Sequence, residues 1–173
     1  MRGLRRGDRS GWRSVSSVIT RLNPATVDAA CDGVVAGAVA WALSGIPSTV
    51  HALVRGVSPL QAVRAAGTLA LSPHASPNAL AVAGVAVHTG LSLGWATLFA
   101  LALPVHRTVP VAVAAGLAVA ALDLGSVGRR YPHIRALPSL PQISDHLAFG
   151  ALVGAVVSRR RSSRCEVEGS VSG

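Results

Sequence analysis

Residues 78–103 read NALAVAGVAVHTGLSLGWATLFALAL, and this stretch decides the fold. Its only ionisable side chain is His88, and it is longer than the ~20 apolar residues that an α-helix needs to cross a bilayer. Ser76 and Pro77 precede it as a helix-start signal, and Pro104 follows it. The stretch therefore predicts a transmembrane helix.

The composition of the whole chain supports the same interpretation. Half of the 173 residues are hydrophobic and only 13% are charged, whereas about a quarter of a soluble domain is charged. Aromatic residues make up only 3%, so small and aliphatic residues supply the apolar surface. Small residues let helices approach one another closely in lipid. We therefore predict an all-α integral membrane bundle.

Three further apolar segments complete a bundle of four transmembrane helices. Asn23 and Pro24 form a helix start, and Pro47 ends or kinks the first segment. Residues 104–108 form a tight turn, so the spans on either side of it should be antiparallel neighbours. The predicted spans are 25–46, 78–103, 109–127 and 141–158, which places the transmembrane domain at 23–158.

A short extra helix is predicted at about 59–71, in the first outer loop. Ser58 and Gln61 match a capping box at its start, and Arg64 interrupts its apolar residues. The segment is too short and too polar to span, so we expect it to lie along the interface or dip into the bundle.

The Arg residues predict the orientation. All 16 basic residues are Arg, a usage typical of a GC-rich bacterial genome, and they lie at the ends and in the loops. Eleven fall on the side of the tails and five on the other. The positive-inside rule then predicts that the tails 1–22 and 159–173 lie in the cytoplasm. We expect both tails to be disordered, and we expect the bundle to lie in the inner (plasma) membrane of a bacterial cell. 

A signal peptide is the alternative interpretation of the first segment. A basic region precedes an apolar run that ends in small residues around Ser44 and Gly45. Asp28 and Asp32 argue against it, because they stand immediately before the apolar stretch.

Several function classes find no support in the sequence. The Arg residues form no basic stripe interleaved with aromatic residues, so we expect no nucleic-acid partner. There is no nucleophile elbow, no zinc helix, no paired-cysteine motif and no phosphate-binding glycine loop. Cys31 and Cys165 are too far apart in sequence to suggest a disulfide framework. We therefore expect no cofactor, and an enzyme is not our first hypothesis for the function.

Pairs of Gly residues four apart recur in three of the spans. Such pairs flatten one face of a helix and favour close helix crossings, within the chain or in a homo-oligomer. The alternative is that a chain rich in Ala and Gly produces this spacing by chance. The candidate packing residues are Gly33, Gly37, Gly90, Gly94, Gly150 and Gly154.

Four ionisable residues inside the spans form the candidate polar cluster. Each costs a few kcal/mol near the middle of a bilayer unless it is paired or hydrated. In the orientation above, all four lie in the outer half of the membrane, at depths of ~6 to 15 Å at 1.5 Å per residue. A carboxylate beside an imidazole can relay protons, hold a divalent metal or orient a base. The residues are His88, Asp123, Asp145 and His146.

A purely structural interpretation of these residues is also open, and caps and satisfied polar pairs are commoner than active sites. Asp145 then caps the fourth helix, Asp123 pairs with Arg129 or Arg130, and His88 makes one hydrogen bond between helices. Asp28 and Asp32, one turn apart, are likewise a cation entry point or an ion-pairing group beside Arg21.

Two short strings carry a family resemblance: DHLAFGALVG at 145–154 and DGVVAG at 32–37. With them the chain resembles small, uncharacterised multi-pass membrane proteins of actinobacteria. The resemblance covers the bundle and not the tails, and it implies no activity.

Three function hypotheses follow. The first is a structural or interaction protein that accompanies a larger membrane assembly. The second is a small transporter or ion-coupled carrier that uses the polar cluster, and the third is a metal-dependent membrane enzyme. The hypotheses differ in what they predict for the polar cluster. A carrier or an enzyme needs its side chains to meet along a hydrated cavity, whereas a structural protein needs each of them to be satisfied separately.

Overall fold

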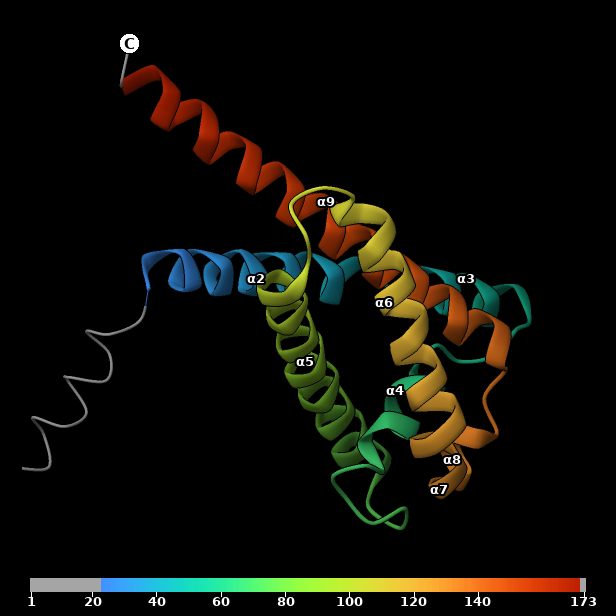
Figure 1. The fold of residues 1–173 in the computed structure, drawn as a ribbon. Coiled ribbons are helices and arrows are strands. Elements are labelled where there is room, and N and C mark those ends of the chain that lie inside the picture. The colour runs from blue at the N-terminus through green and yellow to red at the C-terminus, as the bar shows by residue number, and fades with distance from the viewer. Residues whose placement is uncertain (1–22, 172–173) are drawn as a thin grey trace, which may run out of the picture.

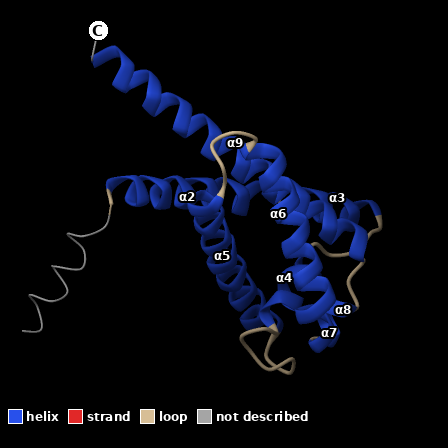
Figure 2. Cartoon of the chain, viewed as in Figure 1, coloured by secondary structure: helices blue, strands red, loops and turns tan. Residues whose placement is uncertain are grey.

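The computed structural model describes residues 23–171, and within that range every regular element is a helix (Figures 1 and 2). The predicted tail 1–22 lies outside the described residues. In chain order the elements are α2 (Pro24–Leu43), α3 (Ile46–Val54), α4 (Leu60–Gly67), α5 (Pro77–Ala102), α6 (Thr108–Leu122), the π-helical turn η1 (Asp123–Val127), α7 (Gly128–Arg130), α8 (Pro132–Arg135) and α9 (Ser139–Val171).

Four helical segments are long and apolar enough to cross a membrane, as the sequence predicts. Their mean hydropathy lies between 1.3 and 1.9. The segments are Pro24–Val54, Pro77–Ala102, Thr108–Arg130 and Ser139–Val167.

The first of these segments is broken in the middle. The side chain of Asn23 accepts a hydrogen bond of 3.1 Å from the backbone N–H of Ala25, which fixes the start of α2 as expected. The helix stops at Leu43, and α3 begins at Ile46, after Ser44 and Gly45. Pro47 lies in the first turn of α3, where its missing N–H leaves no hydrogen bond unmade. Pro47 therefore starts a helix, and the segment extends eight residues beyond the predicted end at 46.

The long helices pack as two pairs. α2 packs on α5, α6 packs on α9, and a contact between α2 and α9 joins the pairs. α5 and α6 run in opposite directions on either side of their short connection, yet they make little direct contact (Figure 1). The expectation that these two spans are packed neighbours is therefore wrong, because each matches a Gly-bearing face of another helix better.

Four of the predicted packing glycines lie at these crossings. A Cβ atom at Gly33 or Gly37 would press on the backbone of α5. A Cβ at Gly150 or Gly154 would press on α6 near Ala112. Glycine therefore allows the two helix pairs to approach as closely as they do.

The remaining predicted pair does not serve the fold in this way. A Cβ at Gly90 or Gly94 would meet no atom within 4 Å. Three glycines outside the predicted set do lie against another helix: Gly67 of α4 and Gly84 of α5 at the crossing of those helices, and Gly116 of α6 against the His146 carbonyl.

α9 is longer than the sequence suggests. The apolar run ends at Ser158, but the helix continues through the run of Arg residues to Val171, so most of the predicted disordered tail is helical. Arg161 explains part of this extension, because it donates hydrogen bonds to the carbonyls of Ala100 at 2.8 Å and Leu103 at 3.1 Å. These carbonyls end α5 and have no partner in their own helix.

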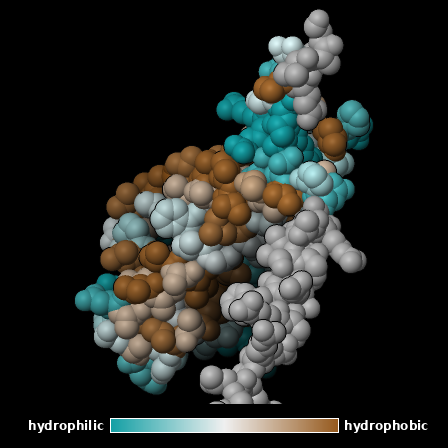
Figure 3. Space-filling model, turned by 90° about the vertical axis from the view of Figure 1, so that its left-hand side faces the viewer, coloured by the Kyte–Doolittle hydropathy of each residue, from teal (hydrophilic) through white to brown (hydrophobic). Residues whose placement is uncertain are grey.

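Large apolar side chains cover the outside of the helical body. The buried core contains many Ala residues with Phe99, Phe149 and Val153, whereas Leu98 is 55% exposed and Val82 is 72% exposed. Figure 3 shows hydrophobic residues over the body and hydrophilic residues gathered where α9 leaves it. Apolar exposure on this scale suits a surface that faces lipid.

Candidate functional site

A cavity of about 350 Å³ lies between α5 on one side and η1 and α9 on the other. The break between α2 and α3 borders it through Ser44 and Ser48, and α4 contributes Ala62 and Ala66. All four residues of the predicted polar cluster line this cavity: His88, Asp123, Asp145 and His146.

Asp123 and His146 form a direct pair across the cavity wall. The carboxylate oxygen Oδ2 of Asp123 lies 3.0 Å from Nε2 of His146. Asp123 is the first residue of η1, where the wider π-turn interrupts α6. Such turns occur often at functional sites, and here the turn places the carboxylate opposite α9. Arg129 and Arg130, the partners expected for Asp123 on structural grounds, do not bind it.

The second ring nitrogen of His146 also has a partner. Nδ1 lies 2.8 Å from the backbone carbonyl oxygen of Gln142, one turn earlier in α9. The ring is thus held at both ends, which fixes its orientation toward η1.

Asp145 satisfies the start of a different helix. Its Oδ1 accepts a hydrogen bond of 2.9 Å from the backbone N–H of Ser48. Ser48 lies in the first turn of α3, where backbone N–H groups have no partner in their own helix. Asp145 therefore caps α3, and the expectation that it caps its own helix is wrong. A carboxylate there also complements the positive end of the α3 dipole.

His88 is the free member of the cluster. It projects from the middle of α5, is exposed, and makes no side-chain hydrogen bond within residues 23–171. The structural interpretation predicted a hydrogen bond from His88 to another helix, and His88 does not form one within the described residues. Its imidazole faces the cavity with one donor and one acceptor available when neutral.

The rest of the cavity wall is mostly apolar. Leu91 and Trp95 come from α5, Val119 from α6 and Phe149 from α9. Phe99 lies beneath them, with its ring centroid 6.3 Å from that of Trp95 and 6.0 Å from that of Phe149. Phe99 and Phe149 belong to the buried core, so the cavity has a polar end and an apolar body that borders the core.

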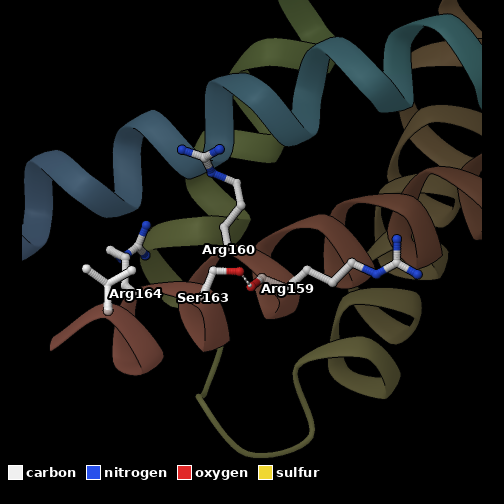
Figure 4. A pocket seen from close by; sticks show the side chains of 5 residues that line it. Arg159, Arg160, Ser163 and Arg164 are labelled. Atoms are coloured by element: carbon white, nitrogen blue, oxygen red, sulfur yellow. Dashed lines mark hydrogen bonds between the residues drawn. The ribbon is translucent and has the colours of Figure 1, made fainter. Parts of the chain in front are cut away.

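A second polar group lies far from the cavity, in the first half of α2. Asp32 is fully buried, and its carboxylate receives hydrogen bonds from Arg160 Nε at 2.7 Å and Arg164 Nη1 at 2.8 Å, together with Arg164 Nη2. Figure 4 shows both Arg side chains reaching from α9 toward α2, at a surface hollow that Arg159 and Ser163 also line. The sequence identified Asp32 as a pairing residue, but its expected partner Arg21 lies outside the described residues.

Asp28, by contrast, is exposed one turn earlier on α2. Asp28 and Asp32 therefore do not form one cation site, since Asp32 is fully occupied by the two Arg side chains.

Neither metal chemistry nor a known family gives this site a ready assignment. Over residues 23–171 no three His, Cys, Asp or Glu side chains gather as metal ligands would. No protein-family model matches the chain, and comparisons with curated proteins and with solved structures give no match either. The resemblance to actinobacterial membrane proteins stays a prediction, and function has to be argued from the cavity.

Proposed function

We propose that the chain is a small multi-pass carrier of the bacterial inner membrane, with both termini in the cytoplasm. Four apolar helical segments and a lipid-like outer surface support insertion. The Arg-rich end of α9 supports a cytoplasmic C-terminus through the positive-inside rule. In this arrangement α4 lies toward the outer side, close to the interface.

The observation that carries the proposal is the shared cavity. The polar residues come from three separate parts of the fold and line one cavity. They are His88 of α5, Asp123 of η1, and the adjacent residues Asp145 and His146 of α9. Side chains with only packing roles have no need to meet around a cavity of this size, whereas a bound solute requires it.

The lining indicates the chemical class of the solute. The polar end holds two carboxylates and two imidazoles, so its charge is negative unless both imidazoles are protonated. The remaining wall is apolar and aromatic. A small amphipathic amine fits both parts, because its ammonium group complements the carboxylates and its hydrocarbon body lies against Trp95 and Phe149.

A ligand series tests this proposal. Purified protein in detergent should gain thermal stability with hexylamine and much less with hexanol or hexanoate. Ala66→Trp fills the cavity from α4 and should abolish the gain. Ala86→Trp, on an exposed position of α5, should keep it. Equal stabilisation by the amine and the alcohol, or a full response in Ala66→Trp, would overturn the proposal.

A structural or interaction role is the second candidate. Gly90 and Gly94 leave an uncovered small-residue face on α5, which another transmembrane helix, from a partner or a second copy, would fit. Replacing Gly94 by Leu should then dissociate a complex isolated from membranes in mild detergent. Unchanged complexes, or none in the parent protein, would remove this candidate.

A further inference from the structure

The inference rests on the proposed function and concerns its coupling ion. We infer that a bound amine displaces the proton shared by Asp123 and His146, so that the chain exchanges one amine for one proton. The observation behind it is that His146 lies between two hydrogen-bond acceptors.

The first acceptor fixes one proton of the imidazole. The carbonyl oxygen of Gln142, 2.8 Å from Nδ1, can accept a hydrogen bond but cannot donate one. Nδ1 therefore carries a hydrogen atom. A neutral His146 then has its lone pair on Nε2, on the side of Asp123.

The second acceptor requires another proton. Asp123 Oδ2 lies 3.0 Å from Nε2, and a carboxylate facing an unprotonated Nε2 would bring two lone pairs together. One proton must lie between these atoms, either on the imidazole with an ionised Asp123 or on the carboxyl group with a neutral ring. In both forms the pair holds one proton and has no net charge.

An ammonium group can replace that proton without any change in total charge. Its N–H groups donate to Asp123 Oδ2 and to the lone pair of His146 Nε2, and the proton leaves to water. One cation enters and one leaves. The two ligands compete for the same two atoms, which is the requirement for exchange rather than simple uptake.

The other titratable groups around the cavity do not share this arrangement. Asp145 is held by the Ser48 backbone N–H, and His88 on α5 has no partner in the described chain. The cavity residues of α2, α3, α4, α6 and α8 carry no titratable group. Arg129 and Arg130 of α7 are exposed and do not line the cavity.

Calorimetry of hexylamine binding in two buffers of different ionisation enthalpy tests the inference. The parent protein should release about one proton per amine, and its affinity should rise about tenfold per pH unit over the pH range in which the pair still holds its proton. His146→Gln removes the ring that holds the proton and should bind the amine without proton release. His74→Gln, at an exposed position outside the cavity, should release the proton as the parent does.

The outcomes separate the two proposals. Binding without proton release in the parent would overturn the exchange and leave the cavity proposal intact, whereas absence of hexylamine binding would overturn both. Should His146→Gln fail to fold, ¹⁵N spectra of the parent decide the matter. On adding hexylamine Nδ1 of His146 should stay protonated, while either Nε2 or, in the ¹³C spectrum, the Asp123 carboxyl group should lose its proton; unchanged signals from both groups would contradict the inference.

Discussion

At the residue scale, two carboxylates one turn apart on α2 show how environment assigns a role. Asp32 is fully buried and accepts hydrogen bonds from two Arg side chains of α9, whereas Asp28 is exposed. A buried carboxylate is tolerated only when its charge is matched and its oxygens are hydrogen-bonded. Asp32 therefore joins the start of the first transmembrane segment to the end of the last.

Asp32→Asn should destabilise the protein substantially. The substitution removes the charge that both guanidinium groups face, and their partial exposure lets water recover part of the loss. We expect a loss of roughly 2–3 kcal/mol in the free energy of unfolding, measured by thermal or chemical denaturation in detergent. Asp28→Asn is the matched control and should change little; equal effects would contradict this account of Asp32.

Asp145 should act as a cap of α3 rather than as a charge. Asp145→Asn keeps a side-chain oxygen that can accept from Ser48 N–H, and Asp145→Ala does not. Alanine should therefore cost about 1 kcal/mol of stability and asparagine clearly less. Comparing the melting curves of both variants checks this, and a larger loss for asparagine than for alanine would show that the cap interpretation is mistaken.

The sequence predicts the members of the candidate site but not their partners. Depth along each span follows from residue number, so the sequence predicts that His88, Asp123, Asp145 and His146 all lie in the outer half of the membrane. The direction in which each side chain points depends on helix packing, which no local pattern encodes. This is why Asp145 was assigned to its own helix, and why the π-turn that aims Asp123 at His146 had no signal in the sequence.

At the element scale, glycine positions decide which helices touch. α4 crosses α5 where Gly67 and Gly84 remove the side chains that would otherwise separate the backbones. The same is true of Gly33, which lies in α2 against α5, and of Gly150, which lies in α9 against α6. The spacing of small residues predicts that a helix has a flat face. It does not predict which other helix packs against that face.

Gly84→Ala should loosen α4 from the bundle. A Cβ at this position would overlap the carbonyl of Val63, so the helices must move apart. We expect a loss of about 2 kcal/mol in stability and faster hydrogen exchange in α4. Gly94→Ala, in the same helix but facing open space, should be neutral or slightly stabilising because alanine is the better helix former. Stability unchanged in Gly84→Ala would argue against this crossing.

Apolar runs predict the four long helices well, and their ends less well. Hydropathy identifies Pro77–Ala102 almost to the residue, because Ser76 caps it and Pro104 follows. Hydropathy predicts that α9 ends at Ser158, because Arg residues follow. It does not take into account that Arg160, Arg161 and Arg164 form hydrogen bonds with other helices. Tertiary hydrogen bonds, rather than local propensity, extend that helix.

At the scale of the whole molecule, two polar groups lie at different levels of an apolar body. Along α2, Asp32 and the cavity residue Ser44 are ~18 Å apart at 1.5 Å per residue. The ion pairs of Asp32 belong to the Arg-rich side, and the cavity lies toward the opposite side.

The orientation predicts the accessibility of Cys165. This thiol is exposed near the C-terminal end of α9, and Cys31→Ser removes the other free thiol among the described residues. A membrane-impermeant maleimide should label Cys165 in inverted membrane vesicles and not in intact cells. Labelling in intact cells would reverse the orientation and place the cavity toward the cytoplasm.

The most direct test is a density map of the protein in lipid nanodiscs with a brominated alkylamine. The account predicts bromine density along the apolar wall beside Trp95 and the ammonium group within hydrogen-bond distance of Asp123, with no such density in Ala66→Trp. A cavity closed by side chains, or amine density confined to the outer lipid-facing surface, would contradict it.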